Sequence, residues 1–257
     1  MKLISSTLLI FLPFWVFSQN SIIAEYLHSS STSNVKMLKS IVLYANQEKA
    51  KQVHLKPKLD KGFEYGASLE DDGNISIIEK PGDFNNIWYY LATTKDIIKS
   101  VTSPNTDYIV YDTNLDYNWE ITNKVDTIGN YQVVKATTSF RGRGFTAWFA
   151  PSIPIGFGPW KLKGLPGLIL NMYDEEKNYT WRLVKLHFNE ELTERLELTI
   201  PKDAKEMTYQ EALNMTNQEN IEKHKRINSK LGVRGGSVKT IRHRERELER
   251  SFEWETE

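Results

Sequence analysis

The sequence predicts a mainly β protein, built on an antiparallel sheet and completed by a C-terminal surface helix. The 257 residues include 12 Tyr, 11 Phe and 7 Trp, and aromatic side chains favour strands. Short apolar runs alternate with turn signals as far as residue 200, a pattern typical of antiparallel sheets. Beyond that point the chain becomes polar and helix-like. Spacing alone leaves open whether the sheet is a barrel, a bowl or a sandwich.

The first strands are predicted over residues 21–26 and 41–46, two apolar runs. Between them, residues 28–34 are rich in Ser, Thr and Asn, and we expect a loop there. Leu69 and residues 75–79 flank an acidic turn sequence, which predicts a hairpin.

The central strands follow one another with clear turn signals between most of them. Ile128-Gly129-Asn130 predicts a hairpin turn, and Arg141-Gly142-Arg143-Gly144 predicts another. The expected strands cover residues 87–91, 108–111, 117–122, 121–125, 131–140, 145–150, 168–173, 179–188 and 196–200.

A helix is predicted over residues 209–231. Thr208 and Glu211 form the capping pattern Thr-x-x-Glu, and Gly232 is a suitable C-cap. Its apolar residues are sparse, so we expect it on the surface. The tail over residues 234–257 is nearly half charged, which is typical of a solvated helix or of partial disorder.

The N-terminus is typical of a secretory signal, with Lys2 followed by an apolar run and the small residue Ser18. We therefore expect a signal peptide over residues 1–18, a β-rich domain over 19–200, and a helix with a charged tail over 201–257. The alternative is an uncleaved anchor, but the ten apolar residues 8–17 are short for a membrane span. We expect export to the periplasm, cell surface or medium, with no transmembrane segment after cleavage.

Composition excludes several function classes. The 33 basic and 33 acidic residues balance, so no net field favours nucleic acid. The chain has no Cys, which excludes disulfides, thiol catalysis and lipid attachment at a cysteine. The five His lack a short metal-ligand spacing, and no hydrolase or nucleotide motif is present. We expect no metal and no cofactor.

Residues 147–170, here called the signature segment, are the most informative part of the chain. Prolines fix its path and glycines permit sharp bends. We expect Pro166-Gly167 to form a type II turn, with Leu165, Leu168 and Ile169 as buried anchors.

Two interpretations of this segment stay open. It is either a structural plug at one end of the sheet, or a stiff loop whose Trp148, Phe157 and Trp160 line a binding groove. Arg141 and Arg143 lie just before it, where they would clamp a carboxylate or phosphate, or else be merely solvated on a turn.

These residues resemble the GLPGLI family of secreted Bacteroidota proteins, whose activity is not established. The resemblance is strongest over residues 131–182. It implies export and a periplasmic or surface location. It also favours a single, strongly curved sheet shaped as an open half-barrel or bowl. The signature residues that carry it are Gly158, Pro159, Gly164, Leu165, Pro166, Gly167, Leu168 and Ile169.

The leading functional hypothesis is a non-enzymatic binding module that presents an aromatic groove to a peptide, a glycan or an envelope protein. A second hypothesis is a periplasmic carrier that holds an apolar ligand in the half-barrel. A third is a hydrolase that uses dispersed carboxylates such as Asp174 and Glu175.

Overall fold

A computed structural model of the chain describes residues 21–32, 35–55, 66–69, 75–78, 87–91, 96–102, 106–189, 192, 194–197, 200, 202–230 and 248–255. The signal peptide expected over residues 1–18 lies outside these ranges.

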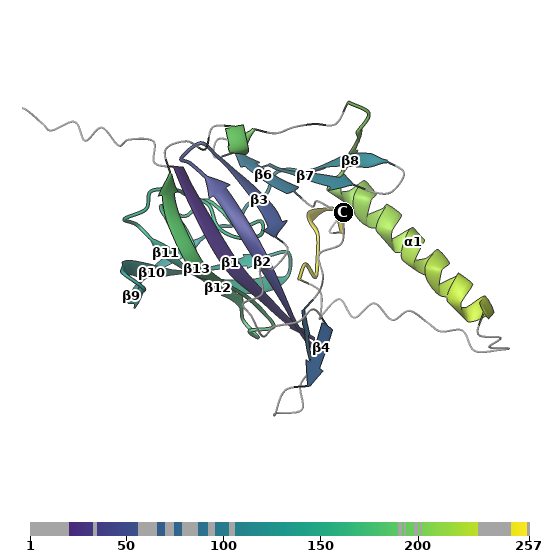
Figure 1. Cartoon of the computed structure of the whole chain (residues 1–257), viewed down its shortest axis with the longest axis horizontal. Helices are drawn as coiled ribbons and strands as arrows, with labels where there is room; N and C mark the ends of the chain where they lie inside the picture. The colour runs from purple at the N-terminus through teal and green to yellow at the C-terminus, as the bar shows by residue number, and fades with distance from the viewer. Residues whose placement is uncertain are drawn as a thin grey trace, which may run out of the picture.

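Fourteen strands of the described residues form one sheet (Figure 1). In chain order they are β1 (Ser21–Thr32), β2 (Val35–Ala45), β3 (Lys49–Leu55), β4 (Gly66–Leu69), β5 (Ile75–Ile78), β6 (Ile87–Leu91), β7 (Ile97–Thr102), β8 (Asp107–Asp112), β9 (Glu120–Ile128), β10 (Tyr131–Phe140), β11 (Arg143–Ala150), β12 (Leu168–Asp174), β13 (Tyr179–Asn189) and β14 (Lys205–Thr208).

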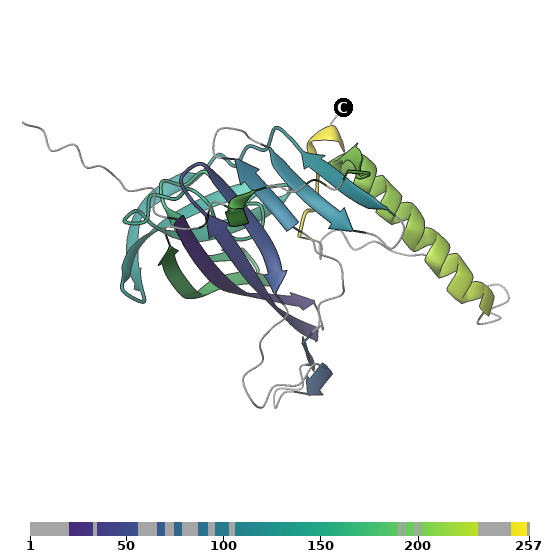
Figure 2. The same ribbon diagram turned by 45° about the horizontal axis from the view of Figure 1, so that its top comes forward.

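The sheet is open and strongly curved. Its main order is β14-β8-β7-β6-β3-β2-β1-β13-β12-β11-β10-β9, with β5 added to β2 and β4 added to β5. Figure 2 shows how β9 to β13 curl away from the flatter region of β6, β7 and β8. Neighbours pair antiparallel except in β14–β8 and β2–β5. The predicted mainly β class and single curved sheet are confirmed.

Several predicted hairpins are confirmed. β4 pairs with β5, and β9 pairs with β10 through a turn in which Gly129 has a φ of 59°. β10 and β11 meet at a two-residue turn, where Arg141 and Gly142 have φ values of 47° and 75°. Positive φ at both central positions matches the right-handed twist of the paired strands.

Other predictions differ from the structure. The loop expected over residues 28–34 is wrong, because β1 continues to Thr32 between two partners, β2 and β13. The strand expected over residues 196–200 is also wrong at its start, since Glu194–Leu196 forms a 3-10 turn, η1. Strands β3, β7 and β14 were not predicted. β14 carries the sheet past residue 200, where the β-rich domain was expected to end.

Helix α1 (Tyr209–Lys230) follows β14 directly and projects away from the sheet beside β8 (Figure 1). The predicted capping box is confirmed: the Thr208 N–H donates to Glu211 Oε2 (2.8 Å), and the Glu211 N–H donates to Thr208 Oγ1 (3.2 Å). Within the described part of the chain, no helix combines the length and apolar character that a membrane span requires.

Candidate functional site

The signature segment packs against the inner face of the sheet through Trp160. The Trp160 ring stacks on Trp181 of β13, with 5.9 Å between centroids, and lies 5.4 Å from the ring of Phe145. The Trp160 N–H donates to Gln52 Oε1 (2.7 Å), and the Tyr90 hydroxyl donates to the Trp160 carbonyl. The segment thus binds strands β3, β6, β11 and β13 together, as the plug interpretation requires.

Two glycines of the segment serve different geometric needs. The type II turn predicted at Pro166-Gly167 is wrong, because Gly167 does not have a positive φ; Gly164 does, at 92°. Gly167 is required for close approach instead, since a Cβ there would lie 2.2 Å from the carbonyl oxygen of Ala150. The predicted anchors are confirmed as buried: Leu165, Leu168 and Ile169.

A recess of about 600 Å³ opens beside the signature segment, between it and residues 115–121. Its lining mixes aromatic rings with amide and ammonium groups. Among the lining residues are Tyr117, Trp119, Phe157, Gln47, Asn118 and Lys163. This volume lies within the usual range for sites that bind small molecules.

Hydrogen bonds fix the two walls of the recess to each other. The Tyr117 hydroxyl donates to the Lys161 carbonyl (2.6 Å), and Trp119 Nε1 donates to the Lys163 carbonyl (2.8 Å). Burial lowers the pKa of the Lys163 ammonium to about 8, although Asp96 opposes this change. The recess is therefore preformed, and its lining includes a lysine whose ammonium has a lowered pKa.

Arg141 lies in a buried ion cluster a short distance away. Its guanidinium donates to both carboxylate oxygens of Asp112 (2.6 and 2.9 Å), to Glu249 (2.5 Å) and to Glu253 (3.1 and 3.2 Å). The Lys161 ammonium donates to Asp112 (2.6 Å) and Glu249 (2.7 Å). The Arg141 and Lys161 side chains are nearly inaccessible to solvent.

The cluster keeps its members charged despite burial. Burial alone would lower the pKa of Arg141, but the carboxylates of Asp112, Glu249 and Glu253 outweigh it and raise that pKa. Burial likewise favours a neutral Glu249, yet Lys161 and Arg141 hold the Glu249 pKa below its usual value. Burial and Glu249 raise the pKa of the Tyr209 hydroxyl, which donates to Glu249 (2.5 Å).

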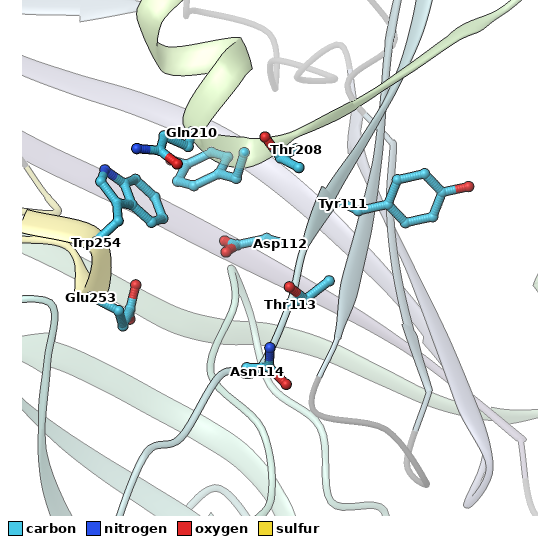
Figure 3. A pocket seen from close by; sticks show the side chains of 9 residues that line it. Tyr111, Asp112, Thr113, Asn114, Thr208, Gln210, Glu253 and Trp254 are labelled. Atoms are coloured by element: carbon cyan, nitrogen blue, oxygen red, sulfur yellow. The ribbon is translucent and has the colours of Figure 1, made fainter. Parts of the chain in front are cut away.

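A cavity of about 330 Å³ lies beside this cluster (Figure 3). The carboxylates of Asp112 and Glu253 and the ring of Trp254 face its interior, whereas the Tyr111 hydroxyl points away. The cavity brings β8, the start of α1 and the last described residues to one place.

Arg143 forms a separate buried pair. Its guanidinium donates to Asp174, and both side chains are fully buried. Asp174 Oδ1 also accepts the N–H of Tyr179 (2.7 Å). Glu176 lies 3.5 Å from the same guanidinium. The two arginines therefore clamp carboxylates of their own chain.

The aromatic groove expected from the sequence is not formed by the residues proposed for it. Trp160 and Phe157 are buried, and Arg141 and Arg143 are enclosed in ion pairs. Trp148 is half-buried and alternates with the buried Phe149 along β11, so it lies on the other face of the sheet. Phe157 alone of the five lines the recess. That these five residues bind a partner stays a prediction.

The residues that form the recess and the cluster were largely missed. Glu249 sits in a charged tail whose composition predicts solvation, and Lys161 reads as an ordinary charge between apolar neighbours. The one usable signal was the aromatic pair Tyr117 and Trp119, which breaks the polar sequence around it. Within the described residues, no three His, Asp or Glu side chains come together as metal ligands.

Comparison with known proteins supports the middle of the chain as its distinctive region. A family described as a protein of unknown function (Porph_ging) matches residues 140–171, which hold the Arg141 turn and most of the signature segment. The resemblance to the GLPGLI family stays a resemblance. No curated protein matches the chain.

Two solved structures of PNGF-II, in the P21 and C2 space groups, are similar in fold. Their TM-scores are 0.55 and 0.53, at 15% and 14% sequence identity. The match covers 77% and 76% of this chain but only 33% and 32% of the PNGF-II chains. At this identity the likeness shows the fold alone. The chain is thus similar to one part of a longer β-rich protein and to a family of unknown function.

Proposed function

We propose that this chain is an exported binding module of the bacterial cell envelope, which acts without catalysis and binds its partner in the recess beside the signature segment. The observation that carries the proposal is the recess itself. It is walled by the segment that distinguishes the chain, and its two walls are hydrogen-bonded into one rigid surface. A preformed surface loses little entropy on binding.

The lining suits a partner with a flat apolar face and polar edges. Trp119 supplies aromatic surface, while the exposed Gln47 and Asn118 supply hydrogen-bonding groups. Sugar rings and the side chains of extended peptides have this character. The partner is therefore a glycan, a peptide or an exposed part of an envelope protein.

Equilibrium binding of the mature chain to a panel of soluble oligosaccharides and short extended peptides tests the proposal. Gln47 is exposed at the recess, so Gln47→Trp would fill it without touching the core. Glu48→Trp is the matched control, since Glu48 is exposed on the same turn and does not line the recess. We expect saturable binding of one class of probe that is lost in Gln47→Trp and kept in Glu48→Trp. Equal binding by both variants would place the site elsewhere.

The alternative of an apolar-ligand carrier gains no support from the described residues. It needs unfilled apolar strand residues inside the curved sheet, but the signature segment packs there through Trp160, Leu162 and Leu168. The alternative of a hydrolase gains none either, because Asp174 is fully buried and bound to Arg143.

A further inference from the structure

Residues 248–255, here called the C-terminal segment, lie on the rest of the chain as a peptide lies on a receptor. Of these residues only Glu253–Glu255 adopt a regular structure, a short 3-10 turn. The N–H groups of Arg250 and Ser251 both donate to the Arg141 carbonyl (2.8 and 3.2 Å). The segment is therefore held by one turn of the sheet and by side chains, not by a strand ladder.

The surface beneath the segment carries unbalanced positive charge of its own. Arg141 and Lys161 are two cations, and Asp112 is the carboxylate from the sheet that lies between them. The β10–β11 turn, Lys161 and Asp112 thus form a site with one net positive charge, here called the socket. Buried unbalanced charge is costly, so the socket favours an anionic ligand.

The C-terminal segment supplies two carboxylates at matching positions. Glu249 accepts from Arg141 (2.5 Å) and from Lys161 (2.7 Å), and Glu253 accepts from the outer edge of Arg141 (3.1 and 3.2 Å). A guanidinium with several carboxylate partners gives geometric specificity as well as energy.

Aromatic rings of the segment complete the contact. Phe252 and Trp254 stack on each other with 4.7 Å between centroids. Their ring centres lie 5.2 and 5.6 Å from the guanidinium carbon of Arg141, within cation–π range. The socket therefore recognises a peptide sequence in which two glutamates lie four positions apart and aromatic residues flank the second.

The chain that leads to the segment is long enough for it to leave and return. Tyr209, the first residue of α1, donates to Glu249, so α1 begins where the segment docks. Its 22 residues extend about 33 Å from that point at about 1.5 Å per residue. Residues 231–247 can span up to about 60 Å, because an extended chain covers about 3.3–3.6 Å per residue.

We propose that the socket is a peptide-binding site for acidic, aromatic segments, and that residues 248–255 occupy it as a detachable ligand. The site persists when the segment leaves, because Arg141 and Lys161 are anchored on the sheet and the signature segment. The segment then acts as a built-in competitor against any peptide of the same pattern.

Fluorescence anisotropy with a labelled synthetic peptide of residues 248–255 tests this. The receptor is the full-length chain carrying Glu249→Gln and Glu253→Gln, which disables its own segment and leaves the socket intact. We expect saturable binding at least about tenfold tighter than to the wild-type chain, whose tethered segment competes at high effective concentration. The control peptide carries glutamine in place of Glu249 and Glu253 and should not bind. Equal binding of the two peptides, or equal binding to variant and wild type, would overturn the proposal.

A milder variant guards against loss of folding, which circular dichroism would report. Glu253→Gln alone changes a side chain that is more than half exposed and keeps Glu249 in the cluster. It should still bind the labelled peptide more tightly than the wild type does. If the folded Glu253→Gln chain shows no such gain, the segment is a fixed part of the fold and not a ligand.

Discussion

Arg141 and Arg143 lie two positions apart on one hairpin and are both buried. Their carboxylate partners come from different parts of the chain. Arg143 pairs with Asp174, which lies on the adjacent strand β12 and is the pairing partner of Phe145. Arg141 meets carboxylates from β8 and from the end of the chain, 29, 108 and 112 positions away. A pair made by strand register forms with the sheet, whereas a cluster made by distant segments depends on the completed fold.

The largest effect is expected from breaking the register-made pair. Arg143→Met leaves the fully buried Asp174 carboxylate without its cation, which should cost about 3–5 kcal/mol of unfolding free energy. Urea unfolding at pH 7 measures this. Adding Asp174→Asn should recover most of the loss, because a neutral amide keeps an acceptor for the Tyr179 N–H. A loss below about 1 kcal/mol in the single variant would contradict a tight, dry pair.

Breaking the assembled cluster should cost less. In Arg141→Ala, Lys161 remains between Asp112 and Glu249, so we expect a loss of about 1–3 kcal/mol, the range for an unsatisfied buried polar group. Arg141→Gly should be less harmful than alanine, because the φ of 47° disfavours a Cβ by about 1–2 kcal/mol. Urea unfolding compares the two. Equal losses would mean that backbone strain at this turn is negligible.

Acid should lower the unfolding free energy of the wild type more than that of Glu249→Gln. The Glu249 pKa is lowered in the folded state, so its contribution to stability is present above its unfolded value of 4.5 and is lost as the pH falls through the folded value. Unfolding free energies measured from pH 7 to pH 3 should fall more steeply for the wild type than for Glu249→Gln below pH 4.5. Parallel curves would contradict an ionised Glu249.

The smallest effect is expected from Arg250, which joins the two arginine sites at the surface. It donates to Glu175 (3.2 Å) and to Glu176 (2.8 Å), the same Glu176 that lies near Arg143. These carboxylates are about half exposed, and exposed pairs add little to stability. Arg250→Ala should leave the urea midpoint unchanged within error. A clear loss would contradict a weak surface contact.

The same contrast explains what the sequence predicts well. Local turn residues predict hairpins such as β9–β10, and two residues three positions apart predict the capping box of α1. β3 reads as Lys-Ala-Lys-Gln-Val-His-Leu, which is too polar to predict a strand, and it forms because β2 and β6 pair on both sides. β14 has no local signal, since its parallel partner β8 lies far away in the chain.

The candidate site follows this rule as well. The anchors of the signature segment could be predicted because Pro and Gly fix a local path. The recess could not, because it needs Tyr117 and Trp119 to lie against Lys161 and Lys163, 44 positions later. The docking of the charged tail could not be predicted either: its composition favours solvation, and burial of Glu249 depends on two cations contributed by other elements.

The hydrogen bond between Tyr209 and Glu249 joins two residues that are 40 positions apart in the chain. For a flexible loop that closes between two fixed points, each doubling of its length costs only about 0.6 kcal/mol. We therefore expect that an epitope or a fluorescent domain inserted between α1 and Leu248 leaves the contact of Tyr209 with Glu249 in place. Such an insertion would label the chain while leaving the recess and the socket as they are.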